Sequence, residues 1–355
     1  MIKKLENKLV GKFKAKECLY TYSGTSALYV SFLYAKSLGR TKILIPNIIC
    51  PQVVIAAIRA GLEYEFCDIN LDDYVMDLNS IKQIYKINNF DILLLAHVYG
   101  HICSNDIISF CKFHNIFIIE DCAQTYKFNP LCDLSIFSFG HTKFLDNDFM
   151  GGGILSMNDL SKLRYINNTL ANPVFEDLDH NIQEYRKEFY NLDKSNDNYF
   201  TKFQELLLKY TKFYKVERYN FVLYKKLDQL EHICKNRIKK MQIYKQEMIH
   251  DLIIHPKLSH DSIAWRYTFR FLGNREKLLV NLRKNNIDCS SWYIGCNKIF
   301  KKKVLKNSSI LENQIVNLWL DEKTSMEKIQ DNIKTIVKII HKLSTKGDNE
   351  YVFFR

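Results

Sequence analysis

Segments that would mark a membrane or secreted protein are missing from this chain. No stretch approaches about 18 uninterrupted apolar residues, so we expect no membrane-spanning helix. The segment 1–17 carries charges throughout and no apolar run, so we expect no secretory signal peptide. The ten cysteines form no CxxC pair, and several lie within apolar runs. These absences predict a cytoplasmic protein whose cysteines are reduced, small core residues.

Signatures of several binding functions are missing as well. Neither a Gly-x-Gly-x-x-Gly loop after a strand nor a Walker-type phosphate loop occurs, which argues against dinucleotide enzymes and P-loop NTPases. Zinc-finger spacings and aromatic-rich RNA-binding signatures do not occur either. The net charge of +12 alone would suit nucleic acid, an anionic membrane or an anionic small substrate. We expect no nucleic-acid or membrane partner, and we interpret the lysines as a solvated surface.

The residues that are present predict an α/β protein. At 355 residues, with 47% hydrophobic and 25% charged residues, the chain can bury a substantial core in one large and one smaller domain. Short apolar strands alternate with helical segments, which is typical of a mostly parallel central sheet flanked by helices. The predicted strands are 42–46, 63–69, 91–96, 116–119, 134–139 and 153–157, and the helices between them are 28–38, 51–60, 77–87 and 105–114.

The C-terminal third has a different pattern of predicted helices and strands. A long amphipathic helix is predicted over 224–250, with apolar residues on or near one face. A smaller α+β region follows, with strands at 264–272 and 315–320 and helices at 275–286 and 325–343. No internal repeat or low-complexity linker occurs. We therefore divide the chain into a large domain, residues 1–225, and a small C-terminal domain, residues 226–355.

One stretch, residues 131–153, carries the main chemical signal. A buried strand ends near Ser138, Lys143 follows within a short turn, and three glycines come next. A lysine just past a buried strand can lose its charge by desolvation and become a nucleophile that holds an aldehyde as a Schiff base. Taken alone, Lys143 could equally be a solvated surface lysine.

Other polar residues collect at the carboxyl ends of the predicted strands. They are His97 and Tyr99, Asp121 and Gln124, and Ser138 with Lys143. Open α/β sheets bind ligands at that edge. A second candidate, the turn Gly24-Thr25-Ser26, opens a helix and can bind an anion such as phosphate, or Ser23 and Thr25 can simply cap that helix.

Together these residues meet the requirements of pyridoxal 5'-phosphate. That cofactor needs a lysine for its aldehyde, a carboxylate for its pyridinium nitrogen, donors for its phosphate and a partner for its ring hydroxyl. Lys143 and Asp121 provide the first two, and Gln124 can meet the ring hydroxyl. The Gly24 turn and Ser138 can hold the phosphate.

At this point the chain resembles a known family, the DegT/StrS family of pyridoxal-phosphate-dependent sugar aminotransferases. The resemblance implies the fold-type I aminotransferase architecture and covers most of the chain in order. It is carried by SGTSAL at 23–28, AGLEYEFCDI at 60–69, HVYG at 97–100, IIEDCAQ at 118–124, FSFGHTK at 137–143, GGGI at 151–154, LDQLEHICKNRIKKMQIY at 227–244 and NIDCSSWY at 286–293.

The resemblance implies a role for each matching residue. Lys143 would form the Schiff base and move the proton, Asp121 would pair with the pyridinium nitrogen, and Gln124 would bond the ring hydroxyl. Thr25, Ser26 and Ser138 would hold the phosphate. The family forms homodimers with shared active sites, in which an asparagine of the second subunit reaches the phosphate, and Asn220 is the candidate here.

The same resemblance implies a reaction. The enzyme would transfer an amino group, from glutamate, to a nucleotide-linked keto-sugar for a polysaccharide or glycoconjugate. A sugar dehydratase of the same fold is an alternative, but that branch has histidine where this chain has Lys143. A non-catalytic scaffold or binding paralogue is the other alternative.

Four departures from the family pattern are visible, and the first two, at Cys50 and Met150, motivate that second alternative. Cys50 stands where an aromatic residue usually stacks on the cofactor, and Met150 stands where an acidic residue precedes the glycines. The pair Trp292-Tyr293 replaces a His-Tyr pair, and the segment 160–220 matches poorly. These departures leave the sugar specificity open.

Three histidines and two arginines have weaker interpretations. His97, His101 and Cys103 have a spacing that could ligate a metal, but a loop after a buried strand explains them as well, and we expect no metal site. His141 is interpreted as a local orienting group. Arg266 and Arg270 could hold an anionic group of a substrate or form structural salt bridges.

Overall fold

A seven-stranded sheet forms the centre of the larger part of the molecule. The structure, a computed structural model, describes residues 2–147, 150–173, 175–216 and 221–345. The strand order is β1-β7-β6-β5-β4-β2-β3, and only β7 runs antiparallel to its neighbours. The strands are β1 (Glu17–Thr21), β2 (Lys42–Pro46), β3 (Glu63–Cys67), β4 (Ile92–Ala96), β5 (Phe117–Asp121), β6 (Leu134–Ser138) and β7 (Gly152–Ser156).

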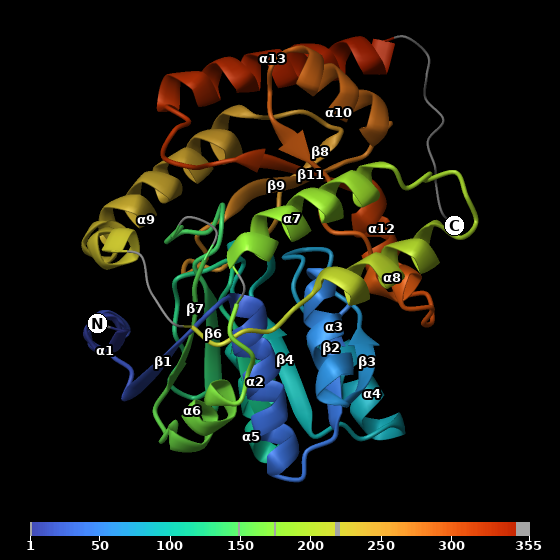
Figure 1. Cartoon of the computed structure of the whole chain (residues 1–355). Helices are drawn as coiled ribbons and strands as arrows, with labels where there is room; N and C mark the ends of the chain where they lie inside the picture. The colour runs from blue at the N-terminus through green and yellow to red at the C-terminus, as the bar shows by residue number, and fades with distance from the viewer. Residues whose placement is uncertain (1, 148–149, 174, 217–220, 346–355) are drawn as a thin grey trace.

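Helices cover both faces of this sheet (Figure 1). One face packs against α2 (Gly24–Ser37) and α3 (Pro51–Ala60), and the other against α4 (Leu78–Ile87) and α5 (Asn105–Phe113). Side chains of β4 alternate between the two cores: Ile92 and Leu94 face the first, and Leu93 and Leu95 face the second. Burial on both faces explains why these strands read as continuous apolar runs.

A smaller, antiparallel sheet lies beyond the carboxyl ends of the parallel strands (Figure 1). Its order is β10-β11-β9-β8, and its own core includes α10 and α13. The elements are β8 (Ile253–Ile254), β9 (Arg266–Phe271), α10 (Arg275–Lys284), β10 (Cys289–Ser290), α11 (Cys296–Ile299), α12 (Lys306–Gln314), β11 (Ile315–Trp319) and α13 (Met326–Thr345).

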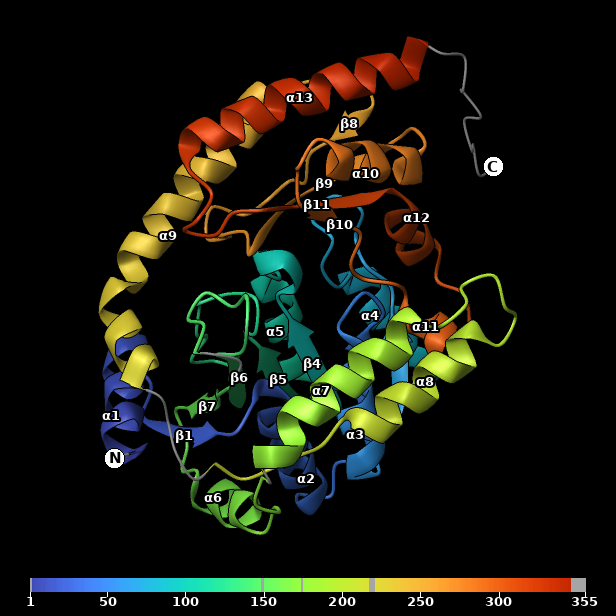
Figure 2. The ribbon, with the colours of Figure 1, turned by 45° about the horizontal axis from the view of Figure 1, so that its top comes forward.

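The long helix α9 (Phe221–Glu247) connects the two sheets along one side of the molecule (Figure 2). Its first half packs against α1 (Ile2–Phe13) and the edge of the large sheet, and Tyr244 belongs to the core of the small one. The remaining helices are α6 (Ser161–Asn168), α7 (Phe175–Tyr190) and α8 (Tyr199–Tyr210). The division at residue 225 falls inside α9 and stays a prediction.

The predicted strands and helices are present, mostly within a few residues of their expected ends. Gly61 ends α3 in the left-handed conformation, as a C-terminal glycine should. All ten cysteines are free and all but Cys50 are buried, which confirms their interpretation as small core residues. In the described part of the chain, no helix is both long and apolar enough to cross a membrane.

The charged N-terminal segment is the clearest omission from the sequence prediction. It forms α1 and β1, and β1 pairs with β7 at the edge of the large sheet. Leu5 and Leu9, one helical turn apart, are fully buried. The spacing of these two leucines was the signal in the sequence for a helix with a buried face. The many charged residues around them made this signal hard to recognise.

The glycines before and within β7 are needed because this strand passes close to the turn that opens α2. Gly151 has a φ of +102°, and a Cβ on Gly152 would lie 2.4 Å from the backbone of Ser23. The glycines therefore allow a close backbone approach, and the neighbour is the chain itself.

Candidate active site

The predicted cofactor residues line one cavity at the carboxyl edge of the large sheet. Lys143, Asp121, Gln124 and Ser138 face it together with Gly24 and Thr25, and Ile49, Cys50 and Val98 complete much of the wall. The residues come from the ends of β5 and β6, the start of α2 and the loop before α3. The topology thus collects side chains that are far apart in the sequence, as expected for this sheet edge.

Lys143 lies on a tight turn that follows β6. Thr142, the residue before it, has a φ of +70°, which is unfavourable for a β-branched residue. The Thr142 N–H donates to Asp146 at 3.2 Å, which helps to hold this turn. Burial lowers the pKa of Lys143, Cys50 and Asp121 act in the opposite direction, and Arg266 lowers it further. A larger fraction of the amine is therefore neutral and nucleophilic.

Asp121 ends β5 and is 7% exposed. Burial raises the pKa of this carboxyl group, while the Ala123 N–H, which donates to Oδ1 at 2.9 Å, and Lys143 lower it. A carboxylate held at the wall of the cavity can pair with a protonated ring nitrogen. This position fits the predicted role of Asp121.

Gln124 is held in one orientation by two tyrosines. The Tyr99 N–H donates to its Oε1 at 2.6 Å, and its Nε2 donates to the Tyr293 hydroxyl at 2.6 Å. Because an amide nitrogen carries two hydrogens, Nε2 can also donate to an acceptor in the cavity. Gln124 is thus suited to bond a ring hydroxyl.

The turn that opens α2 is both a helix cap and a wall of the cavity. Ser23 accepts the Ser26 N–H at 3.0 Å, so the capping interpretation is confirmed. A Cβ on Gly24 would lie 2.7 Å from Cβ of Ser138, so only glycine lets the two walls meet. Gly24 and Thr25 present the positive end of the helix to the cavity.

Ser26 differs in its position from Thr25 and Ser138, the other residues predicted to hold the phosphate. It is fully buried, and its hydroxyl accepts hydrogen bonds from the Ser23 hydroxyl and the Tyr214 N–H, both at 3.2 Å. It is not among the residues that line the cavity. Asn220, the predicted phosphate ligand from a second subunit, lies outside the described residues.

Cys50, at the position where an aromatic residue was expected, does line the cavity and precedes α3 without capping it through its side chain. Burial raises the pKa of this thiol, and the Lys143 charge lowers it. The thiol is therefore mainly protonated and leaves the wall small and apolar.

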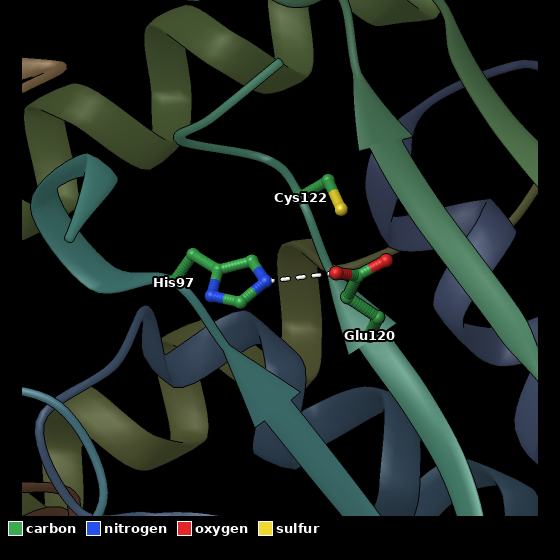
Figure 3. Close-up of side chains that lie close together, drawn as sticks. All are labelled: His97, Glu120 and Cys122. Carbon is green, nitrogen blue, oxygen red and sulfur yellow. Dashed lines mark hydrogen bonds and ion pairs between the residues drawn. The ribbon is translucent and has the colours of Figure 1, made fainter. Parts of the chain in front are cut away.

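A buried polar cluster lies behind the cavity wall. His97, Glu120 and Cys122 offer ligand atoms within 4.8 Å of one another (Figure 3). The Cys103 N–H donates to Nδ1 of His97, so Nε2 carries the proton and donates to Glu120 at 2.9 Å.

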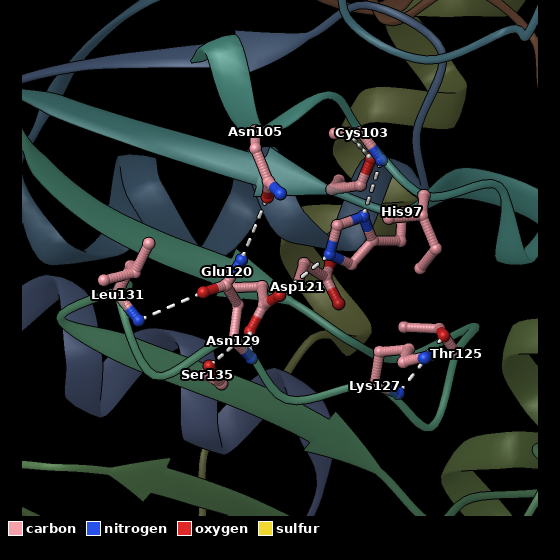
Figure 4. A network of polar contacts seen from close by, with 12 residues as sticks. His97, Cys103, Asn105, Glu120, Asp121, Thr125, Lys127, Asn129, Leu131 and Ser135 are labelled. Carbon is pink, nitrogen blue, oxygen red and sulfur yellow. Dashed lines mark hydrogen bonds and ion pairs between the residues drawn. The ribbon is translucent and has the colours of Figure 1, made fainter. Parts of the chain in front are cut away.

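Glu120 is the centre of a larger network (Figure 4). Its second oxygen accepts hydrogen bonds from the Asn129 N–H and the Ser135 hydroxyl. These hydrogen bonds explain why the carboxylate is buried without invoking a metal ion.

The spacing of His97, His101 and Cys103 does not produce a common site. His101 contacts the carbonyl oxygen of Asp73 at 2.7 Å and the Thr268 hydroxyl at 3.2 Å. Burial lowers the pKa of His101 to about 4, so it is neutral. The Cys103 thiol donates to the carbonyl of Ala96.

Three residues of the site were not assigned roles from the sequence. Tyr99 and Tyr293 orient Gln124, and Trp265, from the loop before β9, contacts the Lys143 turn. Tyr99 and Tyr293 lie in the recognised segments HVYG and NIDCSSWY, but their partners are 25 and 169 residues away. Only the fold brings them together.

Arg266 and Arg270 lie on β9 and have structural partners. The Arg266 guanidinium donates to the Ser290 hydroxyl at 2.8 Å and contacts the rings of Trp265 and Trp319, at 4.2 and 3.9 Å from their centres. Arg270 donates to Gln314 at 3.1 Å. His141 is exposed and lies 3.5 Å from Asp146.

Comparison with known proteins identifies the class. The profile of the DegT/DnrJ/EryC1/StrS aminotransferase family matches residues 1–337. The chain therefore belongs to this family, which confirms the resemblance that the motifs suggested. It is an aminotransferase-family enzyme, and the cofactor of this family is pyridoxal 5'-phosphate.

Individual relatives agree with this class at low identity. GDP-perosamine synthase of Escherichia coli O157:H7 is 28% identical over 167 residues, which are 44% of this chain and 45% of that enzyme. The match thus spans less than half of that relative's length.

Solved structures share the fold. An aminotransferase of the same family from Brucella abortus superposes with a TM-score of 0.73 at 17% identity, covering 95% of this chain and 89% of the other. S. venezuelae DesV, solved in complex with a ketimine intermediate, gives 0.73 at 17%, covering 95% and 88%. Helicobacter pylori PseC, an aminotransferase of pseudoaminic acid biosynthesis, gives 0.70 at 16%, covering 95% and 90%. The chain has the fold-type I architecture.

Proposed function

We propose that the protein is a pyridoxal-phosphate-dependent aminotransferase that moves an amino group, from glutamate, to a nucleotide-linked keto-sugar. The observation that carries the proposal is that Lys143 and Asp121 line the same cavity, together with Gln124, Ser138 and the start of α2. A lysine and a carboxylate on opposite sides of the fold would have argued against it.

Each residue has a role that its position supports. Lys143 would bond the cofactor aldehyde and carry the proton between the Cα of the amino acid and the cofactor. Asp121 would keep the ring nitrogen protonated, so that the bound cofactor can accept the electron pair released when the Cα–H bond breaks. Gln124 would orient the ring through its hydroxyl.

The phosphate would lie at the start of α2. Thr25 and Ser138 supply hydroxyl groups there, and the helix supplies its positive end. Ser26 would act through the backbone of this turn and through its hydrogen bond with Ser23. We propose that Asn220 of a second subunit completes the phosphate site in a homodimer.

The substrate class is supported by the relatives. One relative is named GDP-perosamine synthase, and PseC is described as an aminotransferase of pseudoaminic acid biosynthesis. The net charge of +12 also suits a diphosphate-linked substrate. We infer a role in polysaccharide or glycoconjugate biosynthesis, and the ten unpaired cysteines support a cytoplasmic location.

The experiment is a spectroscopic titration of the purified protein loaded with pyridoxal phosphate. We expect a visible absorption band that shifts when glutamate is added and returns when the correct keto-sugar follows. Lys143→Ala should remove the band, whereas Lys112→Ala, which alters a surface ion pair with Asp133, should not.

The alternatives predict different results. A scaffold protein would show no band, and a sugar dehydratase would release water from the sugar without accepting an amino group from glutamate. A screen of nucleotide-linked 3-keto and 4-keto sugars would then identify the acceptor. A band that persists with a covalent adduct in Lys143→Ala would show that the site is assigned wrongly.

A further inference from the structure

We propose that Trp265 is the positioning residue of Lys143. Through it, the loop before β9 holds the turn that carries the reactive amine. This inference rests on the proposed role of Lys143. The indole Nε1 donates to the carbonyl oxygen of Thr142 at 2.6 Å. Thr142 directly precedes Lys143, so this hydrogen bond holds the peptide unit that joins the two residues.

The Thr142 backbone needs such support. Its φ of +70° is unfavourable for a β-branched residue, and a local conformation of this kind persists only when the surroundings hold it. The Trp265 donor and the Asp146 acceptor bind the two sides of the Thr142 residue, at its carbonyl and at its N–H. Asp146 thus holds the turn from within its own segment, and Trp265 holds it from outside.

Trp265 is itself fixed through its backbone. Its N–H donates to the carbonyl oxygen of Tyr99 at 2.7 Å, and its carbonyl oxygen accepts from Nη1 of Arg237 in α9 at 2.7 Å. The residue is 5% exposed. Tyr99 also orients Gln124 through its own N–H. The hydrogen bond between Trp265 and Tyr99 therefore links the support of Lys143 to that of Gln124.

The indole ring also contacts the amine. Nζ of Lys143 lies 5.0 Å from the centre of the ring. No hydrogen bond or ion pair of Nζ is found within residues 2–147, 150–173, 175–216 and 221–345. When the amine is protonated, the face of the ring attracts it weakly, and this contact helps to direct it.

The chain offers a matched control. Trp319 also contacts the Arg266 guanidinium, at 3.9 Å from its ring centre, whereas the indole hydrogen bond to Thr142 comes from Trp265. Trp265→Phe removes the indole donor and keeps a ring, and Trp319→Phe makes the same change in the other ring that contacts Arg266. Any effect through Arg266 packing should appear in both variants.

The first test uses the apoprotein. Hydrogen exchange of the backbone over residues 140–147 should be faster in Trp265→Phe than in the wild type and unchanged in Trp319→Phe. The rate at which borohydride traps pyridoxal phosphate on Lys143 should fall in Trp265→Phe.

The second test uses the loaded enzyme. We expect kcat for the glutamate half-reaction to fall about 10- to 100-fold in Trp265→Phe with KM nearly unchanged, because a small misplacement of a reacting group costs that much. Trp265→His, which keeps a ring N–H, should retain more of the rate than Trp265→Phe and serves if the latter does not fold.

Equal exchange, trapping and kcat in the Trp265 and Trp319 variants would overturn this inference alone. A lower thermal stability of Trp265→Phe with wild-type kcat would also overturn it, because the residue would then be structural only. If the wild type itself fails to form the covalent bond, the proposed function falls first and this inference falls with it.

Discussion

At the scale of single residues, the site depends on how the protein adjusts two charges that face one cavity. Burial alone would neutralise both Lys143 and Asp121, since it lowers the pKa of the amine and raises that of the carboxyl group. Each charge opposes this shift in the other. The amine is thus poised to be neutral when an aldehyde arrives, and the carboxylate can stay charged beside a protonated ring.

Asp121→Asn should therefore move the reactivity of Lys143 to lower pH. The carboxylate raises the pKa of Lys143, so its removal lets burial and Arg266 lower that pKa further below the ordinary range of a lysine. The amine then becomes neutral at a lower pH. The measurement is the pH dependence of the rate at which the apoprotein reacts with pyridoxal phosphate.

Asp133→Asn is the control, because Asp133 pairs with Lys112 at the surface and does not act on Lys143. In the loaded enzyme, Asp121→Asn should also slow the glutamate half-reaction by about 100-fold or more, as loss of a proton-holding group commonly does. A midpoint that stays in place or moves to higher pH would contradict the electrostatic argument.

At the scale of elements, a residue next to the large sheet holds a helix next to the small sheet. The helix α12 has no side-chain cap of its own. Asp68, just after β3, supplies it instead: the carboxylate accepts the N–H groups of Asn307 and Ser308 at 2.9 and 2.8 Å and the Ser308 hydroxyl at 2.6 Å. A negative group at a helix N-terminus also interacts favourably with the positive end of the helix dipole.

Asp68→Ala should lower the free energy of unfolding by about 2 kcal/mol, the combined effect of a lost cap and of charge-assisted hydrogen bonds. Urea denaturation followed by circular dichroism measures this value. Asp72→Ala, which removes an exposed ion pair with Lys257, should change it by less than about 1 kcal/mol. Equal effects in the two variants would mean that Asp68 does not cap α12.

At the scale of the whole molecule, the proposed homodimer makes the site depend on two chains. We expect light scattering to give a mass of twice 42.0 kDa. If Asn220 acts in the partner's site, mixed dimers of Lys143→Ala and Asn220→Ala subunits contain one site with both native residues.

Mixing and refolding these two inactive variants should therefore restore activity, whereas each variant alone should stay inactive. Lys143→Ala mixed with itself provides the control. Dimers that form without recovering activity, or an Asn220→Ala variant with full activity, would show that Asn220 does not complete the site.

Much of the fold and of the cavity follows from local sequence. The strands of the large sheet are short apolar runs between turns, and burial on both faces makes such runs easy to recognise. Lys143, Asp121, Gln124 and Ser138 were expected at one sheet edge because the carboxyl ends of parallel strands meet there. The departure at Cys50 was also visible, and the structure places this thiol in the cavity wall.

Other features depended on contacts across long distances in the sequence. The segment that forms α1 and β1 packs against α9 and pairs with β7. Ser26 belongs to a motif typical of phosphate binding, yet its hydroxyl bonds with Ser23 and Tyr214 and lies outside the cavity lining.

By itself, the sequence determined the class of the protein and the positions of most of its strands, because these depend on periodicity and short motifs. Only the tertiary structure decided which residues hold the reactive ones: Tyr99 and Tyr293 for Gln124, and Trp265 for the Lys143 turn. The physical reason is that a hydrogen bond requires its partners to meet in space, and partners separated by 25 to 169 residues meet only in the folded chain.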